Sequence, residues 1–168
     1  MLPDIVIVLV MAGLGGILWV GQAYRTLRFA QGQMAAAWAD LTEALGNRRE
    51  MVPYIVAAVP VNISNALDVL GNACDLAANV VGIRECAQAE ARLSAAIARL
   101  FAQLDAEAKL ETREILHPLR DRLKDQEMKI GLLKDLYNRQ AEAFNILLNQ
   151  GAAKILVSFD VIRPAELF

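Results

Sequence analysis

The hydrophobic pattern of the chain changes sharply after its first two dozen residues. From Ile5 to Tyr24 there is no charged side chain, and the only strongly polar residue, Gln22, lies near the end of the run. A helix needs about 20 mostly apolar residues to cross the hydrocarbon core of a bilayer. Because backbone groups in lipid must be paired internally, such a run should form one helix. The pattern therefore predicts a transmembrane helix that contains Ile5, Val20 and Tyr24.

The start of the chain favours a retained anchor over a cleaved signal peptide. A signal peptide begins with positive charge and ends in a small-residue cleavage site, whereas here Asp4 precedes the run and no A-x-A pattern follows Val20. A buried core helix would normally show a polar face, which this run lacks. Ala12 and Gly16 have the spacing that lets two membrane helices approach closely; packing against lipid alone is the alternative.

The residues that flank the run predict its orientation. Arg25 and Arg28 follow it, whereas only Asp4 precedes it. Lys and Arg near a span favour the cytoplasmic side. We therefore expect the N-terminus outside the cell and the chain from Arg25 onward in the cytoplasm.

After the anchor, apolar residues recur in steps of three and four, which is typical of helices packed along a seam. The first such seam is Leu27, Gln31, Met34, Trp38, Leu41 and Leu45. Gly46-Asn47 should end this helix, because glycine commonly follows a helix end. Arg48 and Arg49 then fall in a tight connection near the negative helix end. A second helix should start near Pro53, and Pro60 should kink or split it.

Two further amphipathic segments follow a break at Asn79 to Gly82. The third helix should cover Arg84 to Lys109, and the fourth should run from Thr112 or Pro118 to Asn149. The fourth seam is Leu116, Leu119, Leu123, Gln126, Ile130, Leu133, Tyr137, Gln140, Phe144 and Leu147. Its two glutamines either specify register or lie where the bundle is open.

These segments predict an all-α protein. Residues 1–24 form the anchor, residues 25–150 an antiparallel up-down four-helix bundle with long helices, and residues 151–168 an extended strap on the bundle. Asn138 and Asn145 lie seven residues apart on one stripe beside the fourth seam. We expect them to hydrogen-bond the strap backbone, whose N–H groups need partners; solvated polar positions are the alternative. Trp38 should be a core residue between helices.

Composition and candidate chemistry speak against an enzyme. The net charge is −2, so nothing drives the chain toward nucleic acid. Cys74 and Cys86 have no metal or redox spacing and are best interpreted as small buried residues. Glu114-x-x-His117 has the spacing of ferritin-like ligand pairs, but such a site needs two pairs and this chain has one histidine. We therefore expect no catalytic, cofactor-binding or metal-binding residues.

Several motifs together resemble the LemA family. They are Tyr24-x-x-Leu27, Met34-x-x-Ala37-Trp38, Leu41-x-x-x-Leu45-x-x-Arg48-Arg49-x-Met51-Val52-Pro53-x-Ile55-Val56, Tyr137-Asn138 with Phe144-Asn145, and Phe159 with the ending Ala165-Glu166-Leu167-Phe168. The resemblance implies a single-pass protein of the bacterial inner membrane with a cytoplasmic helical bundle and no established enzymatic activity. It also marks Phe159 and Phe168 as motif residues. The sequence departs from the family pattern at Thr42 and at Asn65-Ala66, among other positions.

The sequence as a whole predicts a membrane-anchored scaffold or adaptor whose partners are the bilayer and other proteins. Two alternatives stay open. One branch of the family is similar to proteins of magnetosome membrane biogenesis, so the chain could act in membrane remodelling or organelle assembly by self-association. Less favoured is a sensor that binds a small ligand or metal in the bundle core.

Overall fold

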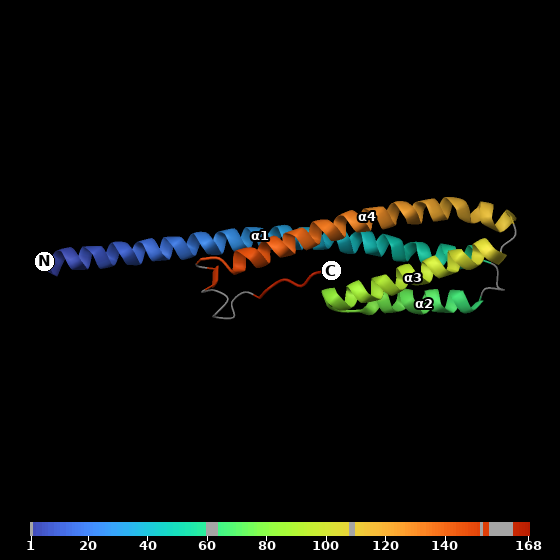
Figure 1. The fold of residues 1–168 in the computed structure, drawn as a ribbon, viewed down its shortest axis with the longest axis horizontal. Coiled ribbons are helices and arrows are strands. Elements are labelled where there is room, and N and C mark those ends of the chain that lie inside the picture. Colours follow the sequence, from blue (N-terminus) through green and yellow to red (C-terminus); the bar gives the residue numbers. More distant parts are fainter. Residues whose placement is uncertain (1, 60–63, 108–109, 152, 155–162) are drawn as a thin grey trace.

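The computed structural model describes residues 2–59, 64–107, 110–151, 153–154 and 163–168 (Figure 1). Side chains are described in these ranges except at 2–6, 8, 64, 107, 110–113 and 115. These ranges contain four helices and no strand: α1 (Leu2–Ala58), α2 (Ser64–Asn79), α3 (Ile83–Glu107) and α4 (Leu110–Leu148). Successive helices run in opposite directions (Figure 1). The predicted all-α, up-down arrangement of four helices is confirmed.

The four helices do not all extend along the whole bundle. α1 and α4 lie side by side over most of the length of α4, while the α2–α3 hairpin packs on the half of this pair that is farther from the N-terminus (Figure 1). In the nearer half, residues 163–168, here called the tail, lie against the pair instead. The N-terminal part of α1 continues beyond the end of α4 as a single helix (Figure 1).

α1 does not end at Gly46-Asn47, and no new helix begins at Pro53, so both predictions are wrong. α1 runs unbroken to Ala58. The reason is that the seam continues past the glycine: Leu45, Val52 and Ile55 are all buried. A glycine inside a helix costs about 1 kcal/mol, whereas burying one aliphatic side chain contributes about 1.5–3 kcal/mol. The predicted break at Asn79 to Gly82 is present, and Gly82 has a φ of 106°.

Pro53 leaves one carbonyl of α1 without its helical partner, since proline has no N–H to donate to the carbonyl of Arg49. The thiol of Cys74 on α2 lies 4.0 Å from that oxygen and donates to it. Pro118 likewise lies inside α4, which begins at Leu110, so of the two predicted starts Thr112 is close and Pro118 is wrong. Pro60 lies outside the described residues.

The seam of α4 is confirmed in part: one of its two heptad positions is buried throughout, whereas Ala141 and Leu148 are buried in place of the predicted Gln140 and Leu147. Every seventh residue is buried: Leu116, Leu123, Ile130, Tyr137 and Phe144. The three last of these pack on the N-terminal half of the α1 seam, and the first two join the core of the α2–α3 hairpin. α4 thus connects both halves of the bundle.

No helix contains a stretch long and apolar enough to cross a bilayer among the residues that the structure describes. The predicted span from Ile5 to Tyr24 begins partly outside that description, at the side chains of residues 5, 6 and 8.

Candidate binding face and the contacts that support it

A buried charge cluster joins the helices at the middle of the bundle. Arg48 of α1 is 1% exposed and Glu90 of α3 is 3% exposed. One terminal nitrogen of Arg48 donates to the Glu90 carboxylate and, at 3.3 Å, to the Glu90 backbone carbonyl. The other donates to Glu127 of α4 and, at 2.6 Å, to the hydroxyl of Ser94 on α3. Arg48 therefore bonds to two other helices at once.

Arg49 extends this cluster to the remaining helix. Its Nη1 donates to the Ala77 carbonyl of α2 at 2.6 Å, and its Nε lies 3.6 Å from Oε1 of Glu90. The predicted placement of Arg48 and Arg49 in a connection at a helix end is wrong, because α1 continues through them. Sequence reasoning missed Glu90, although a signal was present: Arg48 follows Leu45 by three, and Glu90 precedes Leu93 by three, so both occupy seam positions.

The tail is held by the two asparagines of α4, as predicted. Asn145 accepts from the Ala165 N–H at 2.7 Å and donates to the Ala165 carbonyl at 2.9 Å. Asn138 makes the same pair of bonds with Phe168, at 2.9 and 3.2 Å. Each side-chain amide therefore satisfies one backbone N–H and one backbone carbonyl of the extended chain.

Aromatic residues complete the tail contact. The Tyr137 hydroxyl donates to the Glu166 carbonyl at 2.8 Å. The Trp38 ring lies 5.3 Å from that of Tyr137 and 5.9 Å from that of Phe168, which confirms Trp38 as a packing residue between elements. Burial raises the pKa of Tyr137 above its ordinary value. Phe159 lies outside the described residues.

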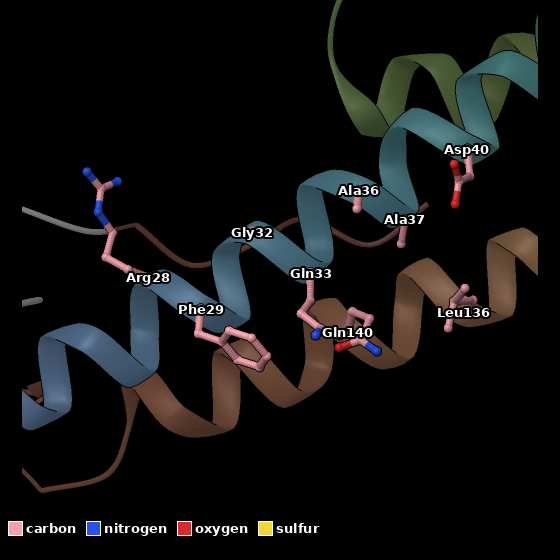
Figure 2. Close-up of a pocket in the computed structure, with 9 residues that line it drawn as sticks. All are labelled: Arg28, Phe29, Gly32, Gln33, Ala36, Ala37, Asp40, Leu136 and Gln140. Atoms are coloured by element: carbon pink, nitrogen blue, oxygen red, sulfur yellow. The ribbon is translucent and has the colours of Figure 1, made fainter.

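On the opposite side, no described residue outside α1 and α4 lines the hollow between these two helices (Figure 2). One hollow, of about 620 Å³, is lined by Arg28, Phe29, Gly32, Gln33, Ala36, Ala37, Asp40, Leu136 and Gln140. A second, of about 450 Å³, lies farther along the same pair and is lined by Asn47, Met51, Tyr54, Leu119, Arg122, Asp125 and Gln126. The two seam glutamines thus lie where the bundle is open, which was one of the two predicted alternatives. We call this surface, from Phe29 to Tyr54 on α1 and from Leu119 to Gln140 on α4, the open face.

Large apolar side chains project from the open face. Phe29 and Tyr54 of α1 and Leu132 of α4 are each 70% exposed. Leu136 is also exposed and lines the first hollow with Phe29 (Figure 2). Exposed apolar side chains beside a hollow are typical of interaction sites.

Comparison with models of protein families shows to which family the chain belongs. The model of the LemA family matches residues 37–168. The chain belongs to the LemA family. The match contains Trp38, the Arg48 cluster and both tail-binding asparagines, whereas the apolar N-terminal run precedes it. No curated protein matches the sequence at a significant level.

Cys74 and Cys86 of this LemA protein are half-buried and free. Burial is the main cause that raises the pKa of each thiol, and the charge of Glu90 raises both further. Nδ1 of His117 lies 3.1 Å from Oδ2 of Asp121, one turn along α4, and the imidazole is exposed. The described part of the chain brings no three His, Cys, Asp or Glu side chains together as metal ligands.

At the end of the bundle nearest the N-terminus, the chain that follows α4 lies against Trp19 of α1. Gly151, which turns the chain after α4 with a φ of 48°, lies so close that a Cβ on it would be 3.2 Å from the Trp19 ring. Trp19, Gln22 and Leu147 line a hollow of about 230 Å³ at this corner. The LemA bundle therefore begins at the level of Trp19, and α1 continues alone on the N-terminal side of it (Figure 1).

Proposed function

We propose that this LemA protein is a single-pass, non-enzymatic membrane scaffold that binds protein partners through the open face. The observation that carries the proposal is the unequal length of the paired helices: α1 continues past the end of the bundle at Trp19, and the continuation has no charged side chain after Asp4.

The length and flanks of this continuation suit a bilayer. From Leu2 to Trp19 the helix is about 26 Å long, and up to Tyr24 it is about 33 Å long, close to the hydrocarbon thickness of about 30 Å. Trp19 would then lie near the headgroups, where tryptophan is enriched. Arg25 and Arg28 follow on the bundle side, which supports a cytoplasmic bundle and an external N-terminus in the inner membrane of a bacterium.

The charges and surfaces of the bundle favour binding over chemistry. The arginines and carboxylates around the buried Arg48 and Glu90 are bonded to one another and hold helices together. The open face, in contrast, offers apolar side chains beside two hollows. Such a surface can bind a helix of another protein, because side chains of one helix fit between those of another.

Alkaline carbonate extraction of cell membranes tests the anchor. We expect the full chain to stay in the membrane pellet and to need detergent for release. Leu14→Arg should move it to the supernatant, because an arginine at the centre of a span costs about 2.5–3.5 kcal/mol. The matched control is Leu132→Arg, an exposed leucine of the open face, which should stay in the pellet. Extraction of the unaltered chain by carbonate alone would refute the proposal.

A further inference from the structure

The open face is one continuous surface of the size that stable complexes use. Phe29, Ala36, Asp40, Asn47 and Tyr54 follow one another on α1 in steps that keep them on one side of the helix, and they line the two hollows. The face is about 38 Å long and about 20 Å wide, given the rise and diameter of two helices, hence roughly 760 Å². A specific interface of standard size buries about 800 Å² on each partner.

The Phe29 side chain and the first hollow lie at the same height on the open face, that is, at the same position along the helix axes. Phe29 stands at the edge of the first hollow (Figure 2). Apart from the adjoining residues and backbone of α1 itself, no atom lies within 4 Å of where a Cβ of Gly32 would be. A two-fold axis parallel to the helices brings each height of one copy against the same height of the other. Phe29 of one copy can then enter the hollow beside Gly32 and Ala36 of the second.

Charge on the open face is complementary in the same arrangement. The exposed charges of α1 from residue 40 to residue 50 are acidic: Asp40, Glu43 and Glu50. On α4, Arg122 and Asp125 line the second hollow. The exposed Lys129 lies seven residues from both Arg122 and Leu136, which line the two hollows, and so shares their side of the helix. Because the two-fold sets α1 of one copy against α4 of the other, acidic side chains face basic ones. Complementary potentials of this kind favour association and fix its register.

We infer that the protein bound on the open face is a second copy of this chain, packed in parallel about a two-fold axis along the rods. The inference rests on the proposed anchor, since two copies inserted with the same orientation in one membrane present their open faces in parallel. Confinement to the membrane also raises the effective concentration of one copy for the other.

Cross-linking in membranes tests this inference with two neighbouring alanines. Ala36 lines the first hollow, and Ala35 is exposed on a different side of α1. Treated with a flexible bismaleimide, the Ala36→Cys chain should form a cross-linked dimer. Ala35→Cys should give no more dimer than the unaltered chain, whose half-buried Cys74 and Cys86 set the background. Equal cross-linking at both positions, or none at Ala36→Cys, would overturn the inference.

A charge exchange tests the orientation of the pair. In the Ala36→Cys background, Asp40→Lys with Glu43→Lys should abolish the dimer, and so should Lys129→Glu. Expressing these two altered chains together should restore cross-linking between them, because opposite charges again face each other. A cross-linked product with a different protein in place of the dimer would also overturn the inference.

Carbonate extraction of the same samples separates the two proposals. A chain that stays in the pellet without forming the Ala36→Cys dimer refutes the second-copy inference and leaves the scaffold proposal standing. A chain found in the supernatant refutes the anchor itself.

Discussion

Arg48 of α1 and Glu90 of α3 form an ion pair that is buried on both sides and shared with Glu127 of α4. Removing one partner of a buried ion pair costs about 3–5 kcal/mol, and the low end of this range is expected here because Glu127 still pairs with Arg48 when Glu90 is lost. Glu90→Ala should therefore lower the free energy of unfolding by about this amount, measured by denaturant titration of the helical circular dichroism signal in detergent.

An exposed pair provides the control for this experiment. Arg120 donates to both carboxylate oxygens of Asp105, at 2.8 and 2.9 Å, at the surface of the α3–α4 contact. Water screens such pairs, so Asp105→Asn should cost less than about 1 kcal/mol. Equal losses in the two variants would contradict a special role of the Arg48 cluster.

The tail should loosen when its asparagines are removed. The N–H groups of Ala165 and Phe168 donate to Asn145 and Asn138, so hydrogen exchange at these two amides reports the contact directly. Asn145→Ala should accelerate exchange at Ala165, and Asn138→Ala at Phe168, by about tenfold each if the bonds contribute about 1.4 kcal/mol in sum. Proteolysis near Phe159 should increase in parallel.

Asn149→Ala is the matched control for the tail. Among the contacts described, the Asn149 side chain bonds only to the Asn145 carbonyl within the last turn of α4. Exchange at Ala165 and Phe168 should stay as in the unaltered chain. Unchanged exchange in the Asn138 and Asn145 variants would show that packing of Phe168 and Ala165 alone holds the tail.

Stability should fall at alkaline pH through Tyr137. Burial raises the pKa of this phenol above its ordinary value of 10.0, so the folded state holds the proton more tightly than the unfolded state. The resulting stability is complete below about pH 10 and is lost as the pH rises through the raised pKa. The phenolate also has no proton to donate to Glu166.

A pH series of denaturant midpoints measures this effect. Tyr137→Phe should be less stable than the unaltered chain at neutral pH by about 1 kcal/mol, because one hydrogen bond is lost. Above about pH 10 its stability should decline less steeply. Identical slopes in the two chains would contradict the role of Tyr137. Cys74 and Cys86, whose pKa values burial raises above 9.0, contribute equally in both.

Seam periodicity predicted most of the fold, because each buried residue of α4 falls where a repeat of three and four places it. The prediction for Asn138 and Asn145 succeeded for a related reason: polar residues beside a seam can reach an extended chain that lies along it. The predicted end of the first helix at Gly46 was wrong because it rested only on the local cost of a glycine inside a helix, which is about 1 kcal/mol. The opposing burial of Val52 and Ile55 is a tertiary effect.

The buried charge cluster and the open face could not be derived in the same way. Arg48 and Glu90 occupy seam positions, but which charge meets which depends on how four helices are placed. The open face exists because the tail and the α2–α3 hairpin both pack on the other side of the α1–α4 pair. Gln126 and Gln140 are polar positions in the apolar seam of the sequence and so indicated an open side, but they did not show which residues line it.

Brominated lipid gives the most direct test of a bundle that starts at the membrane. The chain has two tryptophans, Trp19 at the proposed bilayer surface and Trp38 about 28 Å farther along α1. In vesicles, bromine on the acyl chains should quench the fluorescence of the Trp38→Phe variant, which keeps Trp19, and leave that of Trp19→Phe nearly unchanged. Fluorescence of Trp19 that brominated lipid does not quench would contradict the account.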